Sequence, residues 1–163
     1  MTIPTLSLWA GGHGNLSDER DSLPAGEWLL RAFLLTAMQL DFTKLDGLVS
    51  AVVQDATSGR VLMVGYMNQA AFEKTVATGL VTFFSRSRHK LWTKGETSGH
   101  TLVVREITTD CDQDAVLIQA EARGPGVCHN GYQSCFYRRL EAGEWREKES
   151  RAFDPAVVYG GGA

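Results

Sequence analysis

The sequence predicts an α+β fold with a mostly antiparallel β-sheet and few helices. Between residues 48 and 140, short apolar and β-branched runs alternate with Gly-, Asn- and Asp-containing turns, and a single stretch has a marked helical pattern. Several strands with short connections and one helix are typical of an α+β domain. The 163 residues, 44% of them hydrophobic, suffice for one domain plus an extension.

The first part of the chain, residues 1–43, is predicted to be an N-terminal extension. Residues 2–26 are rich in Gly, Ser and Pro, whereas residues 27–40 carry apolar side chains at helical spacing. Such a helix usually packs on its own domain or on a partner. A membrane-surface role has weak support, because Arg31 is the one basic residue of the stretch.

The same region lacks the features of targeting segments. The first basic residue is Arg20, and residues 28–40 are too short an apolar stretch to span a bilayer. We therefore expect a protein of the cytoplasm with no membrane association. Sixteen Lys and Arg against nineteen Asp and Glu give a net charge of −3, which argues against nucleic acid as a partner.

Residues 44–140 are predicted to form the folded domain, and residues 141–163 a C-terminal tail. The helix of the folded domain has the clearest sequence signals, since Asn68 stands at the N-cap position and Gly79 at the C-terminal stop. The elements expected along the domain are a hairpin of strands 48–54 and 60–66, the helix 69–78, and strands at 80–84, 101–109, 115–122 and 135–140.

Three aspartates alternate along Asp110-Cys-Asp-Gln-Asp114. If the segment is extended, Asp110, Asp112 and Asp114 share one face and Cys111 points to the other. Three carboxylates on one face repel one another unless a cation such as Mg²⁺ or Ca²⁺ lies between them. A solvated acidic turn is the alternative. An EF-hand loop is excluded, because its sixth position would be Ala115 instead of Gly.

The three cysteines, Cys111, Cys128 and Cys135, lie within 25 positions. Three thiolates with a fourth position open are typical of catalytic zinc, whereas His129 as a fourth ligand would make a closed, structural site. We prefer His129 as a non-ligand, because sequence neighbours rarely both reach one small ion. Three buried free cysteines are the alternative. An odd number without Cys-x-x-Cys disfavours both a disulfide framework and a redox dithiol.

A basic segment, residues 85–99, ends in a polar loop with two glycines and two hydroxyls. Cations, hydroxyls and exposed backbone N–H groups are what phosphate needs, although the spacing is not that of a Walker loop. An ordinary charged hairpin is the alternative, and Trp92 is either a core residue or a platform for a base. The candidate substrate contacts are Arg86, Arg88, Trp92, Lys94, Thr97 and Ser98.

These motifs together resemble the phosphoribosyl-AMP cyclohydrolase family of histidine biosynthesis. Asn130 departs from the family pattern, in which we expect Thr. Only 23 residues follow Leu140, too few for the second domain of bifunctional relatives, so we expect the monofunctional form. The matching stretches, in family order, are Gly65-Tyr-Met-Asn68, Ser85-Arg-Ser-Arg88, Leu91-Trp-Thr-Lys-Gly-Glu-Thr-Ser-Gly99, Asp110-Cys-Asp-Gln-Asp114, Cys128-His-Asn-Gly131 and Ser134-Cys-Phe-Tyr-Arg138.

The resemblance implies an intertwined homodimer with metal sites at the dimer interface. Zinc would be held by the cysteines matching Cys111, Cys128 and Cys135, drawn from two subunits, and Mg²⁺ by the aspartates matching Asp110, Asp112 and Asp114. The implied reaction hydrolyses the N1–C6 bond of the adenine ring in 1-(5-phosphoribosyl)-AMP. Its product is the ring-opened formimino-aminoimidazole carboxamide ribonucleotide.

For the mechanism, we expect zinc to lower the pKa of water from 15.7 to about 7, for attack on C6. His129 is the candidate catalytic proton shuttle, and Mg²⁺ would hold substrate phosphate. The competing hypothesis is a non-enzymatic module in which zinc has only a structural role, a zinc-stapled module that chelation would unfold. A base deaminase is disfavoured, since its H-x-E and P-C-x-x-C signature is missing.

Overall fold

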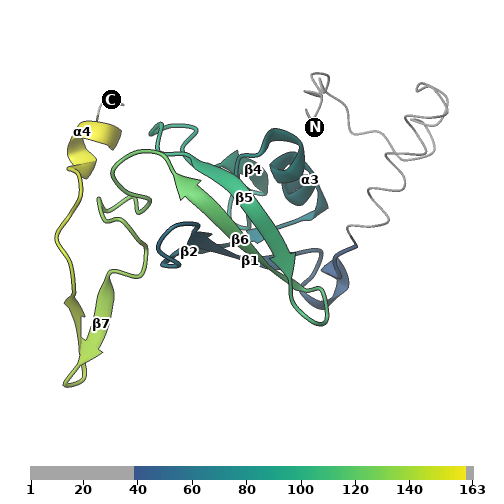
Figure 1. Cartoon of the computed structure of the whole chain (residues 1–163), viewed down its shortest axis with the longest axis horizontal. Coiled ribbons are helices and arrows are strands. Elements are labelled where there is room, and N and C mark those ends of the chain that lie inside the picture. Colours follow the sequence, from purple (N-terminus) through teal and green to yellow (C-terminus); the bar gives the residue numbers. More distant parts are fainter. Residues whose placement is uncertain (1–38, 161–163) are drawn as a thin grey trace. The chain divides into compact units, whose positions relative to one another are not determined.

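The computed structural model describes residues 39–160, coloured along the chain in Figure 1. The expected helix at 27–40, and the extension apart from residues 39–43, lie outside the described residues. Among the described helices, none combines the length and the apolar character needed to cross a membrane.

A four-stranded sheet with the order β2-β1-β6-β5 forms the centre of the domain. β1 pairs antiparallel with β2, and β5 pairs antiparallel with β6, whereas β1 and β6 are parallel. The prediction of a mostly antiparallel α+β fold is confirmed, with this one parallel pair in the middle. The four strands are β1 (Val49–Asp55), β2 (Val61–Met67), β5 (Leu102–Thr109) and β6 (Ala115–Ala122).

The two central strands bury alternate side chains, as a sheet packed on one face requires. In β1, Val49, Ala51 and Val53 are completely buried. In β6, Val116 and Ile118 are equally inaccessible. Both strands were predicted from apolar and β-branched runs between turns, and the structure confirms them as β1 and β6.

The helix α3 (Gln69–Thr78) has the two caps that the sequence predicts. The Asn68 side chain accepts a hydrogen bond from the N–H of Ala71 at 2.9 Å, and Gly79 ends the helix in the left-handed region. The buried Thr75 hydroxyl accepts from the N–H of Thr82 at 2.9 Å. That bond ties the helix to the next strand, β3.

A second, two-stranded sheet consists of β3 (Thr82–Ser85) and β4 (Lys90–Thr93), so the basic segment forms a hairpin. Phe83 and Trp92 lie opposite each other in it, with ring centroids 5.0 Å apart. Phe83 packs directly on Gly65 of β2, where a Cβ atom would lie 2.3 Å from the ring. Glycine at position 65 therefore lets the two sheets approach each other.

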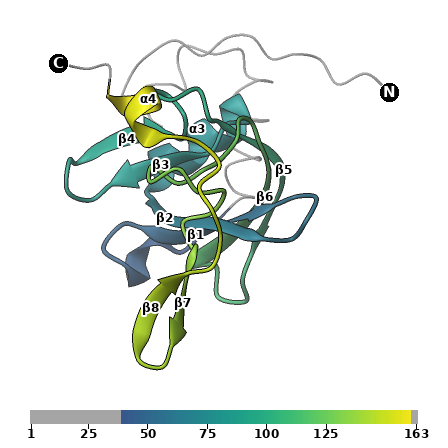
Figure 2. The same cartoon turned by 90° about the vertical axis from the view of Figure 1, so that its left-hand side faces the viewer.

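The C-terminal part of the chain forms a hairpin of β7 (Arg138–Glu141) and β8 (Glu144–Glu147), followed by α4 (Pro155–Tyr159). Figures 1 and 2 show this hairpin extending away from the four-stranded sheet. The expected strand at 135–140 is wrong for its first three residues. The Ser134 hydroxyl and the Cys135 N–H each donate a hydrogen bond to a carbonyl of β2. These bonds hold the segment in an irregular loop instead of a strand. Residues 141–160, assigned to a tail, contain β8 and α4.

Candidate functional site

The three aspartates between β5 and β6 gather into one cluster. A carboxylate oxygen from each of Asp110, Asp112 and Asp114 lies within 4.8 Å of the others. The segment is a turn, with Gln113 at a φ of 61°, so the extended geometry assumed from the sequence is wrong. The turn is closed by Oδ1 of Asp110, which accepts from the N–H groups of Asp114 and Ala115 at 3.2 Å.

The turn also changes the expected place of Cys111. In an extended segment its thiol would point away from the aspartates, but here Sγ lies 3.9 Å from Oδ1 of Asp112. Both side chains are exposed to solvent. A soft thiol and hard carboxylates therefore occupy the same end of the sheet.

A lysine from the short helix η1 (Phe42–Lys44) balances part of the acidic charge. Nζ of Lys44 lies 2.6 Å from Oδ2 of Asp112 and 3.5 Å from Oδ2 of Asp114. The hydrogen bond to Lys44 lowers the pKa of Asp112, and the same bond raises the pKa of Lys44. The cluster thus carries one internal cation, and its oxygen donors suit a hard metal ion such as Mg²⁺.

The other two cysteines belong to the loop after β6. The N–H of Cys128 donates to the carbonyl of Tyr132 at 3.0 Å, and the N–H of Cys135 donates to the carbonyl of Leu62 at 2.8 Å. Cys128 is buried, and Cys135 is exposed. Desolvation of the Cys135 thiol, and then the neighbouring Cys128 thiol, raise the pKa of Cys135 to about 12. Two adjacent thiols of this kind suit a thiophilic cation such as Zn²⁺.

A lysine lies next to this thiol pair. Lys94 is 7% exposed, and burial lowers the pKa of its ammonium group, while Cys135 and Cys128 act in the opposite direction. The Lys94 N–H donates to the carbonyl of Val81 at 2.9 Å, which fixes the start of the polar loop. Lys94 is therefore a cation held between the loop and the thiols.

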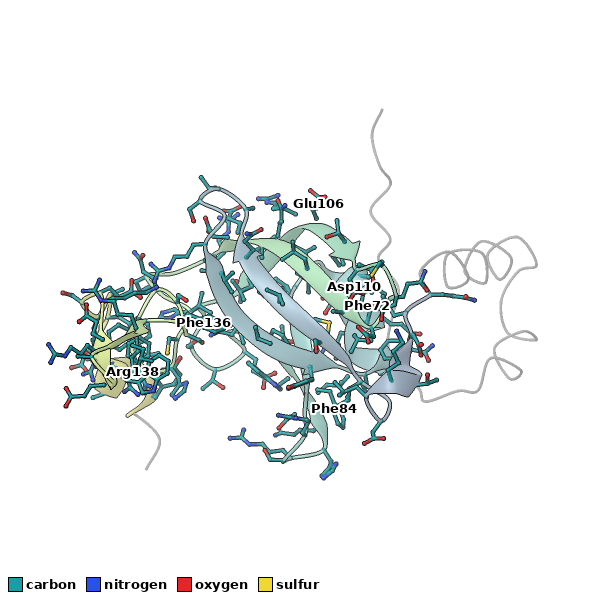
Figure 3. The ribbon with its side chains drawn as sticks, turned by 90° about the horizontal axis from the view of Figure 1, so that it is seen from below. Phe72, Phe84, Glu106, Asp110, Phe136 and Arg138 are labelled. Carbon is teal, nitrogen blue, oxygen red and sulfur yellow. The ribbon has the colours of Figure 1, made fainter. Side chains whose placement is uncertain are left out.

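Cys111 does not join the other cysteines within one chain. Cys111 lies in the turn before β6. The N–H of Cys135 donates to the carbonyl of Leu62, and the sheet register places Leu62 level with the middle of β6. Three strand residues already span about 10 Å, while zinc–sulfur bonds of about 2.3 Å need thiols much closer together. In Figure 3, Asp110 and Phe136, the sequence neighbours of Cys111 and Cys135, lie well apart, with strands of the four-stranded sheet between them.

A cavity of about 300 Å³ opens beside Cys135 and Lys94. Four segments far apart in the sequence contribute to it: β2, the β3–β4 hairpin with the polar loop (residues 94–99), the cysteine loop (residues 124–135) and α4. Its lining residues are Met63, Arg88, Trp92, Thr93, Lys94, Gly95, Glu96, Thr97, Ser98, Val127, His129, Cys135 and Tyr159.

Most of the residues predicted as substrate contacts share this cavity. Arg88, Trp92, Lys94, Thr97 and Ser98 line it. So do His129, which is exposed, and Cys135. The site therefore combines cations, hydroxyls, an imidazole and a thiol around one space.

Arg86 lies elsewhere. Its guanidinium group lies 3.9 Å from the ring centroid of Tyr66, which is the geometry of a cation–π contact. It is not among the lining residues of the cavity. The aspartate cluster and Cys111 are also outside that lining.

Three polar lining residues, Thr93, Glu96 and Tyr159, were not predicted from the sequence. The Glu96 carboxylate accepts a hydrogen bond from the N–H of Thr93 at 3.0 Å and shapes the loop. Tyr159 lies in α4, which was taken as part of a tail. The signal that could have revealed α4 is Asp154 followed by Pro155, an N-cap residue before a proline at the first helical position.

Comparison with known proteins gives a consistent result. The sequence profile of the phosphoribosyl-AMP cyclohydrolase family matches residues 63–137. Among curated relatives, a phosphoribosyl-AMP cyclohydrolase of Solibacter usitatus is 69% identical over 124 residues, which are 76% of this chain and 98% of the relative. Another of the same name, from Desulforapulum autotrophicum, is 52% identical over 123 residues, which are 75% and 98% of the two chains.

Proposed function

The chain belongs to the phosphoribosyl-AMP cyclohydrolase family, and from this premise we propose how it opens its substrate. The proposed reaction is the zinc-dependent hydrolysis of the N1–C6 bond of the adenine ring in 1-(5-phosphoribosyl)-AMP. The product is the ring-opened formimino-aminoimidazole carboxamide ribonucleotide. We place this step of histidine biosynthesis in the cytoplasm.

The observation that carries the proposal is the composition of the cavity. Lys94 and Arg88 supply positive charge, and Thr97 and Ser98 supply hydroxyl donors, all within one loop and its hairpin. These groups suit the phosphates of a nucleotide. Cys135 and His129 line the same cavity, so a phosphate-bound substrate would be held beside them.

The thiols of Cys128 and Cys135 fit zinc. Desolvation, and then the neighbouring Cys128 thiol, raise the pKa of Cys135, and a bound cation would stabilise both groups as thiolates. When bound, zinc would supply a Lewis acid that lowers the pKa of water into the neutral range. Lys94 beside the thiols would offset the negative charge of the thiolates.

His129 is proposed to move the proton. Its side chain is exposed and lines the cavity next in sequence to Cys128. An imidazole titrates near neutral pH and can take a proton from water and return it to the ring nitrogen N1 as the C–N bond breaks. As a sequence neighbour of Cys128, His129 is assigned this role instead of zinc ligation.

The aspartate cluster is proposed to hold Mg²⁺. Its three carboxylates lie close enough to share one ion, and oxygen is the ligand that Mg²⁺ prefers. Lys44 occupies part of the same space and would be displaced or retained as a second positive charge. We assign Mg²⁺ the binding and orientation of a substrate phosphate.

A homodimer is proposed because the zinc ligands are divided within one chain. Strand register separates Cys111, in the turn before β6, from Cys135, which bonds to Leu62 of β2, so we propose that a second copy brings the third thiol. Exposed apolar side chains at Phe136, next to Cys135, and in the β7–β8 hairpin support such an interface. Phe136, Leu140 and Trp145 are 49%, 60% and 68% exposed, and Leu140 lies opposite Trp145 in the hairpin.

The function is tested by following ultraviolet absorbance while the purified protein is incubated with phosphoribosyl-AMP, with and without a zinc chelator. We expect formation of the ring-opened product, and its loss on chelation while far-ultraviolet circular dichroism stays unchanged. A folded, zinc-loaded protein that leaves the substrate intact would contradict the proposal. Unfolding on chelation, without turnover beforehand, would favour the zinc-stapled module instead.

A further inference from the structure

We infer that Tyr159 contacts the aromatic base of the substrate, and that the C-terminal segment from Ala152 to Tyr159 is a wall of the substrate site. The inference rests on the proposed function and deepens it. Tyr159 lines the cavity although it lies beyond residue 137, where the match to the family profile ends. Its place in the site therefore has to be argued from this chain's own contacts.

The segment is anchored on the cysteine loop. The carbonyl of Gly131 accepts hydrogen bonds from the N–H groups of Ala152 and Phe153 at 2.7 and 3.2 Å. Gly131 has a φ of +91°, and a Cβ atom there would lie 2.3 Å from the carbonyl oxygen of Phe153. Glycine thus permits the close approach that joins the C-terminal segment to the loop of Cys128 and His129.

A second contact fixes the segment against the polar loop. The ring of Phe153 packs edge-to-face on His100, with centroids 4.7 Å apart and planes at 84°. His100 directly follows the polar loop, and Gly95 of that loop lies so close that a Cβ atom would approach the backbone of His100 at 2.5 Å. Phe153 is therefore held by both loops that line the cavity.

Helix α4 then carries Tyr159 to the cavity. The Asp154 side chain caps the helix by accepting from the N–H of Ala156 at 2.9 Å, and Pro155 sets its first turn. The rings of Phe153 and Tyr159 have centroids 6.5 Å apart. Tyr159 is 38% exposed, so part of its ring is open to a bound molecule while the rest is packed.

The chemistry of the lining divides the cavity between two parts of a nucleotide. Cations and hydroxyls of the polar loop suit phosphate, whereas a planar base needs apolar or aromatic surface. Such surface comes from Met63, Trp92, Val127 and Tyr159. Removing an aromatic ring that stacks on a base weakens binding by roughly fivefold or more, and this is the effect we expect at Tyr159.

The test compares wild type, Tyr159→Ala, Tyr159→Leu and Tyr159→Phe. Val157→Ala is the matched control, because Val157 belongs to the same helix, is 80% exposed and does not line the cavity. Calorimetric dissociation constants are measured for AMP, which has a base, and ribose 5-phosphate, which has none. We expect Tyr159→Ala and Tyr159→Leu to weaken AMP binding by at least about fivefold, and ribose 5-phosphate binding by less than twofold. Tyr159→Phe and Val157→Ala should bind AMP as wild type does.

Equal weakening of both ligands, or unchanged AMP binding, would overturn the inference. Binding is measured independently of turnover, so failure of the proposed function is visible separately as wild-type protein that binds AMP without opening phosphoribosyl-AMP. Thermal melting and zinc content of each variant establish that the fold is intact. For active protein, Tyr159→Ala should raise KM for phosphoribosyl-AMP by a factor similar to that for AMP.

Discussion

The ammonium nitrogen of Lys44 lies 2.6 Å from Oδ2 of Asp112 and joins η1 to the acidic turn between β5 and β6. The Lys44 ammonium group therefore competes with any bound cation for the aspartate oxygens. We therefore expect Lys44→Met to bind Mg²⁺ about two- to fivefold more tightly than wild type, in the range of exposed ion pairs. Calorimetric titration measures the affinity, and Lys148→Met is the control. Unchanged affinity would show that Lys44 and Mg²⁺ do not share the site.

The same ion pair predicts a pH dependence of metal-free stability. The pKa of Asp112 is lowered below its ordinary value of 3.8, so its contribution is present above that value and is lost as pH falls through the folded pKa. The pKa of Lys44 is raised above 10.5, so its contribution is lost as pH rises through that raised value. The difference in Tm between wild type and Lys44→Met should be constant from about pH 5 to 9 and vanish at both extremes. A difference that changes between pH 6 and 8 would contradict this assignment.

The divided cysteines predict complementation between inactive chains. In a mixed dimer of Cys111→Ser and Cys128→Ser, one site loses both ligands and the other keeps all three. Random subunit exchange puts half of the chains into mixed dimers, so about one quarter of wild-type activity and zinc should return. Mixing Cys128→Ser with Cys135→Ser is the control and should restore no activity. In the proposed dimer one chain supplies both Cys128 and Cys135 to a site, so every site of this mixture lacks one of them. No recovery in the first mixture, after exchange is demonstrated, would place the site within one chain.

His129 is predicted to act on protons and not to hold metal. His129→Ala should keep stoichiometric zinc while kcat falls by about 10²- to 10⁴-fold, the range for loss of a general acid–base. His89→Ala is a suitable control, because His89 is exposed in the turn between β3 and β4. Zinc is measured by atomic emission and kcat by absorbance. Loss of zinc would make His129 a ligand, and near-normal turnover would end its assigned role.

The exposed apolar hairpin predicts which surface forms the dimer. Trp145→Lys should shift the protein toward monomer in sedimentation experiments and lower both zinc content and activity, since each proposed zinc site draws its thiols from two chains. Val76→Lys is the matched control, because Val76 is 43% exposed on α3, away from the hairpin. A Trp145→Lys protein that stays dimeric would exclude the hairpin as the interface.

Elements whose signals are local could be predicted from the sequence alone. Asn68 and Gly79 cap α3 through bonds within a few residues, and the alternation in β1 and β6 follows directly from the strand period. The sequence also identified Trp92, Lys94, Thr97 and Ser98, which line the cavity from β4 and the polar loop. These groups are neighbours along the chain, so spacing alone sufficed to group them.

Which distant groups meet depends on how the chain packs. The parallel pairing of β1 with β6 and the bond from Cys135 to Leu62 place Cys111 far from the other thiols, which no spacing in the sequence expresses. The turn at Gln113 brings Cys111 toward Asp112 instead of away from it. Tyr159 reaches the cavity because Gly131 and His100 hold Phe153. Such contacts depend on strand register and on close backbone approach, which are properties of the packed chain and not of local sequence.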